Sequence, residues 1–142
     1  MTDIDLREIF ATTRTIAVVG FSNKPERASY MVAAFLQSKG YRVIPVNPGL
    51  AGKTYLDETV YADLAAIPAN IEVDMVDIFR APEHVPEVVD AALEHLPHLR
   101  TIWMQLGVIH EGAASKARHA GKMVVMDRCP KIDYPRVMQA GV

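Results

Sequence analysis

Short apolar runs alternate with segments of helical periodicity along nearly the whole chain, and this alternation limits the possible folds more than any other feature of the sequence. The segments expected to be strands are 15–19, 41–46, 73–79, 101–104 and 122–126. Apolar residues between them recur at the spacing of one helical face, most clearly over residues 85–96. Apolar strands joined by helices are typical of a parallel sheet that is covered on both faces.

We therefore predict an α/β protein, a Rossmann-like three-layer sandwich built on a five-stranded parallel sheet. Right-handed crossovers leave few topologies for such a sheet, and we expect the strand order 3-2-1-4-5, counted along the chain. This order places the ligand crevice between the carboxyl ends of strands 1 and 4. Further helices are expected near residues 6–10, 28–36, 61–67, 111–120 and 135–139, and the start of the second is left open between Pro25 and Ser29.

Length and charge exclude several classes of protein. With 142 residues, the chain fits a single domain spanning 1–142, with its core over about residues 14–135. A formal net charge of −2 without a dense basic block argues against binding to nucleic acid. No apolar stretch is long enough to cross a bilayer, and the first ten residues lack the layout of a secretory signal, so we expect a cytoplasmic protein. The sequence does not indicate protein partners or an oligomeric state.

The segment after the first expected strand carries the strongest ligand-binding signal. Gly20 permits a tight turn, and the helix that follows would point its N-terminal N–H groups at the crevice. The polar members of this segment are Ser22, Asn23, Lys24 and Arg27. Arg80, after the third strand, offers another cation from across the crevice. Such a set of donors suits a phosphate-bearing ligand, although a simple turn with solvated cations is the alternative.

Other motifs are incomplete. Only the first glycine of the dinucleotide-binding pattern G-x-G-x-x-G is present, and Asn47 stands where an acidic residue would hold a ribose diol. His110 begins a zinc-protease pattern, but Ala114 replaces its second histidine. Asp74 and Asp77 would point to opposite faces of a strand, and we expect Asp77 to form hydrogen bonds at the sheet end. The sequence therefore indicates no metal ligands and no recognisable catalytic residues, and leaves enzymatic activity open.

The single cysteine, Cys129, follows the last expected strand and lies beside Arg128. One cysteine cannot form an internal disulfide. Its position at the expected site edge leaves three interpretations, in this order: a structural thiol, a redox-active thiol and a catalytic nucleophile.

A family resemblance rests on five ordered segments, GFSNKPER (20–27), GYRVIPVNP (40–48), VDIFR (76–80), WMQLGV (103–108) and DRCP (127–130). Together they resemble the stand-alone bacterial and archaeal CoA-binding proteins, a family similar to the N-terminal CoA-binding domain of the succinyl-CoA synthetase α subunit. The resemblance covers about residues 14–135. It implies a non-catalytic protein that binds CoA or an acyl-CoA at the C-terminal edge of the parallel sheet.

The resemblance also implies a set of site residues. The CoA phosphates would be held by Gly20, Phe21, Ser22, Asn23, Lys24 and Arg27. The rest of the crevice would be lined by Val46, Asn47, Phe79, Arg80, Gln105 and Gly107. The phosphorylated histidine of the synthetase belongs to a domain that this sequence lacks, so thioester synthesis is not expected. A mixed disulfide between CoA and Cys129 is a further hypothesis.

Two alternatives to a CoA-binding module stay open. One is a nucleotide-dependent oxidoreductase, against which the missing ribose acid counts, and the other is a subunit of an acyl-CoA-processing enzyme completed by another chain. A structural partner with a vestigial pocket is a third, weaker interpretation.

Overall fold

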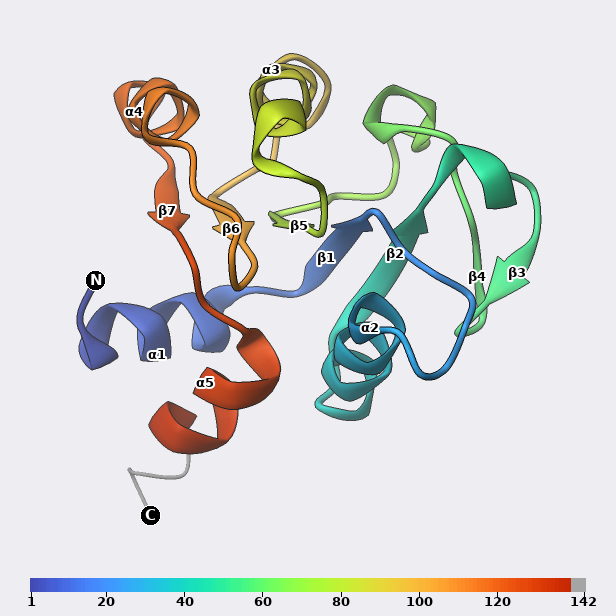
Figure 1. Ribbon diagram of the computed structural model, residues 1–142, viewed down its shortest axis with the longest axis horizontal. Helices are drawn as coiled ribbons and strands as arrows, with labels where there is room; N and C mark the ends of the chain where they lie inside the picture. Colours follow the sequence, from blue (N-terminus) through green and yellow to red (C-terminus); the bar gives the residue numbers. More distant parts are fainter. Residues whose placement is uncertain (139–142) are drawn as a thin grey trace.

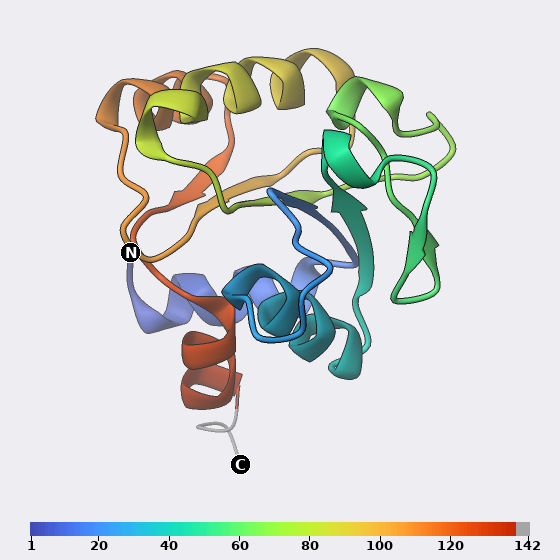
Figure 2. The ribbon, with the colours of Figure 1, turned by 45° about the vertical axis from the view of Figure 1, so that its right-hand side comes forward.

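A five-stranded parallel sheet forms the centre of the computed structural model, which describes residues 1–138 (Figure 1). Its strands are β1 (Thr15–Val19), β2 (Arg42–Val46), β5 (Met75–Ile78), β6 (Thr101–Met104) and β7 (Met123–Val125). One face is covered by α1 (Asp3–Thr12), α2 (Ala28–Ser38) and α5 (Pro130–Met138), and the other by α3 (Val85–His95) and α4 (Glu111–His119) (Figure 2). The predicted Rossmann-like sandwich is confirmed.

The predicted strand order is wrong. The sheet runs β2-β1-β5-β6-β7, which is 2-1-3-4-5 when its five strands are counted along the chain. Pro45 gives the physical reason, because its carbonyl faces away from β1, where it accepts the Tyr61 N–H at 3.1 Å. The N and O atoms of one strand residue share an edge, so the missing proline N–H lies on that outer edge too. A strand that cannot donate there stays at the side of the sheet, and the third strand pairs with β1 instead.

This order moves the topological switch point. Both neighbours of β1 run parallel to it, with Ile16 aligned to Val43 of β2 and to Met75 of β5. The chain moves outward from β1 to β2 and then returns past β1 to β5, so the direction of strand addition reverses at β1. The crevice therefore opens between β1 and β5. The prediction of a crevice between strands 1 and 4 is corrected accordingly.

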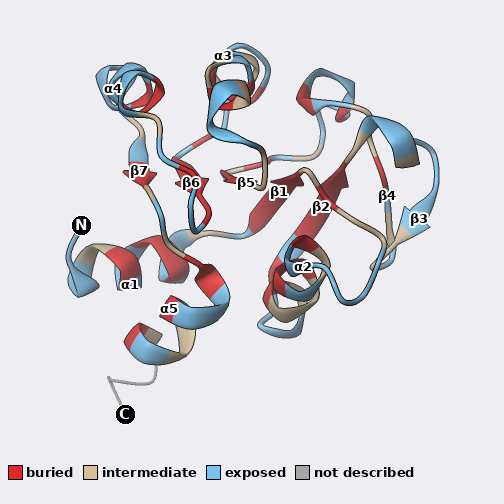
Figure 3. Ribbon diagram, viewed as in Figure 1, coloured by how far each residue is buried: buried red, intermediate tan, exposed pale blue. Residues whose placement is uncertain are grey.

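Two buried clusters fill the space on either side of the sheet (Figure 3). Alternate residues of β1 belong to different clusters: Ala17 and Val19 face α3 and α4, whereas Ile16 and Val18 face α1, α2 and α5. The buried face of α4 consists of small residues, which allows this helix to lie close to the sheet. Its members are Ala113, Ala114 and Ala117. Within residues 1–138, every helix falls short of the length and apolar character that a bilayer span needs.

The connection from β2 to β5 differs most from expectation. It contains the 3₁₀ turns η1 (Pro48–Leu50) and η2 (Leu64–Ala66), and a hairpin of β3 (Thr54–Tyr55) and β4 (Glu58–Thr59). Leu56 and Asp57 form its turn with φ of 54° and 63°, a conformation usually signalled by glycine or asparagine, so the sequence carried no hairpin signal. The helix expected at 61–67 is reduced to η2.

Other boundaries shift by a few residues. The leading helix is present as α1, and α2 begins at Ala28, so Pro25 stays in the preceding loop. The last helix begins at Pro130 rather than near 135, because proline favours the first helical position and the Cys129 carbonyl accepts the N–H groups of the next turn. The part of that prediction at Gln139 lies outside the described residues. A 3₁₀ turn, η3 (Pro82–His84), leads into α3.

Candidate functional site

Gly20 brings the end of β1 against the end of β5. Its φ is +87°, and a Cβ added there would lie 2.3 Å from the Phe79 carbonyl oxygen. Only glycine fits this contact, because any side chain would overlap the backbone of the neighbouring strand. The close approach sets the floor of the crevice at the switch point.

The first amide groups of the loop are used within the protein. The N–H groups of Gly20 and Phe21 both donate to the Val46 carbonyl, at 3.1 and 3.2 Å, and the Ser22 N–H donates to the Ser29 hydroxyl at 2.9 Å. Phe21 is fully buried, and its ring lies 5.9 Å from that of Tyr30. These contacts shape the loop, and the side chain of Phe21 supports it from beneath.

The start of α2 supplies free donors. Arg27 is the N-cap residue, and its side chain makes no capping hydrogen bond. Within the described chain, the N–H groups of Ala28, Ser29 and Tyr30 have no acceptor, and the first helical bond joins the Met31 N–H to the Arg27 carbonyl. Three unpaired N–H groups and the positive end of the helix dipole favour an anion at this point.

A cavity of about 340 Å³ opens in front of this helix end. It is lined by Gly20, Ser22, Lys24, Arg27, Ala28, Ser29 and Phe79. Lys24 and Arg27 are exposed, and within residues 1–138 neither forms an ion pair with a carboxylate. Free backbone donors and two solvent-facing cations make this cavity, called here the loop cavity, suited to a phosphate group.

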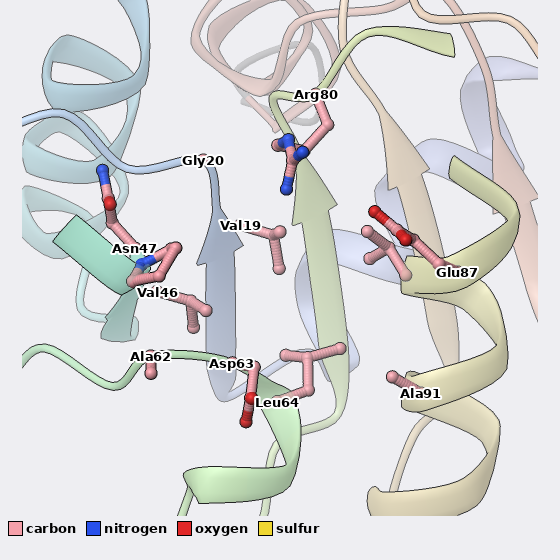
Figure 4. A pocket seen from close by; sticks show the side chains of 12 residues that line it. Val19, Gly20, Val46, Asn47, Ala62, Asp63, Leu64, Arg80, Glu87 and Ala91 are labelled. Atoms are coloured by element: carbon pink, nitrogen blue, oxygen red, sulfur yellow. The ribbon is translucent and has the colours of Figure 1, made fainter. Parts of the chain in front are cut away.

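A second cavity, of about 580 Å³, shares Gly20 with the loop cavity. Figure 4 shows the side chains that line it. It is lined by Val19, Gly20, Val46, Asn47, Pro48, Ala62, Asp63, Leu64, Arg80, Glu87, Val88 and Ala91. Asn47 and Arg80 stand on opposite sides of it, at the ends of β2 and β5. An apolar lining can contact the faces of a flat ring, and the few polar groups at the rim can bind a charged substituent of that ring. We call it the helix cavity, because α3 forms one wall.

Two asparagines brace the loops around these cavities. Asn47 donates from Nδ2 to the Phe21 carbonyl at 2.6 Å and accepts the Gly49 N–H at 2.7 Å through Oδ1. Asn23 donates to the Tyr55 hydroxyl at 2.8 Å and so fastens the loop to the β3–β4 hairpin. The side-chain amides of both predicted site residues are therefore bonded within the protein.

The loops after β6 and β7 meet at the other end of the crevice. Gly107, with φ of +79°, donates its N–H to Asp127 at 2.7 Å, and the Trp103 indole donates to the Arg128 carbonyl at 2.8 Å. Cys129 is 8% exposed and packs in the cluster beneath α5. Phe21, Asn23, Gln105 and Gly107 line neither cavity, whereas the other predicted site residues line one or both.

Asp74, which precedes β5, and Asp77, which lies within it, have different surroundings. Asp74 accepts the N–H groups of Arg14 and Thr15, which lie at the opposite edge of the sheet. Asp77 is fully buried within β5, and removal from water raises the pKa of its carboxyl group well above the ordinary value. Its neighbour is the Gln105 amide. The hydrogen bonding expected for Asp77 stays a prediction, because a bond from Gln105 requires the amide nitrogen to face the carboxyl group.

The wall formed by α3 was missed by the sequence interpretation. Glu87, Val88 and Ala91 fall on the same helical face and enter the helix cavity from above the sheet. Their positions could have been inferred once β5 was placed next to β1, because the helix after β5 then lies over the crevice. Asp63 and Leu64, from the connection without a helix, carried no comparable signal.

Comparisons with known proteins agree on the family. A family model described as a CoA binding domain matches residues 14–135. The uncharacterized protein YneT of Bacillus subtilis (strain 168) is 34% identical over 132 residues, which is 92% of each chain. A solved structure from Thermus thermophilus, cell-free ID.343, is 32% identical with a TM-score of 0.89, over 96% of this chain and 99% of that one. A hypothetical protein from Pyrococcus horikoshii OT3 is 33% identical with a TM-score of 0.88, over 97% and 93%. The chain belongs to the CoA-binding domain family.

Proposed function

We propose that this protein binds CoA or an acyl-CoA at the C-terminal edge of its sheet and acts as a binding module without catalysis of its own. Family membership supports CoA as the ligand. The observation that carries the proposal is the row of unpaired N–H groups at the start of α2, which opens on a cavity lined by Lys24 and Arg27. That row is a phosphate site by its chemistry, and CoA brings a diphosphate.

The diphosphate occupies the loop cavity in this proposal. Ala28, Ser29 and Tyr30 donate backbone N–H bonds, while Lys24 and Arg27 supply charge. Each charge-assisted bond is stronger than a neutral one, and the Arg27 guanidinium can hold two phosphate oxygens at once. The amides of Gly20 and Phe21 take no part, because Val46 already accepts both.

The adenosine part of the ligand occupies the helix cavity. Val19, Val46 and Val88 offer apolar contact to a base, and Arg80 offers a cation to the 3′-phosphate of the ribose. Gly20 lines both cavities, so a single ligand can span them without crossing a side chain at that point. This arrangement gives each part of the nucleotide a matching surface.

The oxidoreductase alternative is less well supported. NAD enzymes of this fold hold the ribose diol with a carboxylate at the end of the second strand. Here that position is Asn47, and both ends of its amide are already bonded. The carboxylate of Asp63 lies in the helix cavity, but it caps η2 by accepting the Ala66 N–H at 2.9 Å.

Calorimetric titration with CoA, 3′-dephospho-CoA, NAD, NADP and ATP tests the proposal. We expect CoA to bind most tightly and its dephospho form more weakly, because the latter lacks the group assigned to Arg80. A ligand present at 100 times its dissociation constant stabilises the fold by about 2.7 kcal/mol, so melting curves give an independent check. Binding of NAD or ATP without binding of CoA would overturn the proposal.

A further inference from the structure

Ser29 is a buried polar residue whose hydroxyl group the proposed function leaves unused. It is the second residue of α2 and is 6% exposed. Its Oγ accepts the Ser22 N–H at 2.9 Å, and both serines line the loop cavity. The hydroxyl oxygen therefore lies at the wall of this cavity, between the loop after β1 and the start of the helix.

The hydroxyl proton of Ser29 has no acceptor among the residues that the structure describes. A serine hydroxyl can donate one hydrogen bond and accept others, and Ser29 takes part only as an acceptor. At the other end of α2, by contrast, the Ser38 hydroxyl donates to the Phe35 carbonyl at 2.6 Å. A buried donor without a partner is costly, so an acceptor atom of a ligand in the loop cavity would remove that cost.

The other polar side chains of the loop cavity also offer donors. The Ser22 Oγ accepts the Lys24 N–H at 3.2 Å, so a backbone amide engages this hydroxyl oxygen as well and leaves its proton available. Lys24 and Arg27 can only donate. An ionised phosphate group carries acceptor oxygens without a proton, and it matches such a set of donors.

We propose that Ser29 is a specificity-determining residue whose hydroxyl donates a hydrogen bond to a phosphate oxygen in the loop cavity, and that the Ser22 N–H positions this hydroxyl. The inference rests on the proposed function and adds a side-chain contact to it. A hydrogen bond to a charged oxygen is stronger than one to a neutral oxygen. A ligand without a phosphate at this point leaves the buried hydroxyl proton unpaired, and the site discriminates against it for that reason.

NMR titration of adenosine 3′,5′-bisphosphate and of adenosine 3′-monophosphate tests the inference. Both nucleotides carry the phosphate assigned to Arg80, but only the bisphosphate has a 5′-phosphate for the loop cavity. We expect Ser29→Ala to weaken binding of the bisphosphate and of CoA about tenfold and to leave the monophosphate unchanged, because one charge-assisted bond is lost. Ser29→Thr keeps a hydroxyl group and should retain most of the affinity. Ser38→Ala, on the same helix, is the matched control and should bind all three ligands like wild type.

Each other outcome contradicts the inference in a defined way. Unchanged affinity of Ser29→Ala for the bisphosphate removes the hydroxyl from the site. Equal weakening of both nucleotides shows an effect through the loop alone, because the bond to the Ser22 N–H is lost as well. A loss in Ser29→Thr as large as that in Ser29→Ala contradicts donation by the hydroxyl.

Failure of wild type to bind CoA is a failure of the proposed function instead. Should Ser29→Ala not fold, the Hβ resonances of Ser29 in wild type must shift with the bisphosphate and not with the monophosphate, or the inference is wrong.

Discussion

The α-carbon of Gly20 lies so close to the Phe79 carbonyl that a methyl group on it would stand 2.3 Å from the oxygen. The ends of the neighbouring strands β1 and β5 thus touch at Gly20, which lines both cavities. Neither backbone can shift without disturbing the sheet, because Gly20 donates to Val46 and Phe79 donates to Val19. The contact therefore fixes the geometry of the crevice.

Gly20→Ala tests that contact. The variant combines strain at positive φ with overlap against the backbone of β5, and we expect it to lose about 3 kcal/mol or more of unfolding free energy in urea titrations. Gly52→Ala is the matched control, since Gly52 has φ of +86° with open space around its Cα, and it should lose only about 1–2 kcal/mol. Equal losses in the two variants would show that the approach to Phe79 is unimportant.

Arg27→Ala should weaken CoA binding without unfolding the protein. The side chain is exposed and makes no cap, so its removal leaves the fold intact, whereas loss of a charge-assisted bond to phosphate lowers affinity about tenfold or more. Calorimetric titration measures the loss, which should shrink as ionic strength rises. Arg100→Ala, an exposed cation at the opposite edge of the sheet, is the control; unchanged affinity in Arg27→Ala would exclude Arg27 from the site.

Asp77→Asn should alter how stability depends on pH. Burial raises the pKa of Asp77 in the folded protein well above 3.8, so the stability that its proton confers is complete below the unfolded pKa and is lost as pH rises through the folded pKa. Asparagine does not titrate, so the stability of the variant relative to wild type should increase with pH between those values by at most about 1.4 kcal/mol per pH unit. Urea titrations from pH 4 to 9 measure this difference, and parallel curves would contradict it.

Cys129 should react slowly in the folded protein. Attack on CoA disulfide would join the Cys129 sulfur to one CoA sulfur and release the other CoA as thiolate, but the residue is buried in the cluster beneath α5. We expect intact-mass spectra of protein incubated with CoA disulfide to show no adduct until denaturant is added. A reductant-sensitive adduct on folded protein would revive the mixed-disulfide hypothesis.

Local sequence patterns were sufficient to predict most helices and strands. They failed for features that depend on pairing between distant residues. α3 and the strands could be predicted because burial on one or both faces produces a periodic pattern of apolar residues along the sequence. Strand order depends on which edge of β2 can pair, and Pro45 is the residue of β2 that limits this. The hairpin went unpredicted because Leu56 and Asp57 adopt a turn that their residue types rarely signal.

The candidate site divides in the same way. Ser22, Lys24 and Arg27 line the loop cavity as their place after β1 suggested, since the end of a parallel strand is fixed by the fold class. The wall from α3 followed only from the correct strand order. The internal partners of Asn23 and Asn47 were beyond prediction, because these hydrogen bonds span 32 and 26 residues and depend on how the loops pack.

The β3–β4 hairpin holds the loop after β1 through Tyr55 and holds α2 through Leu56, whose carbonyl accepts the Gln37 amide at 2.6 Å. Arg42 and Glu58 pin its far strand to β2. These contacts hold the loop in one conformation in the absence of ligand. Binding of a ligand there should therefore cost little conformational entropy. Loss of the hairpin contacts should raise the dissociation rate of the ligand far more than it lowers the association rate.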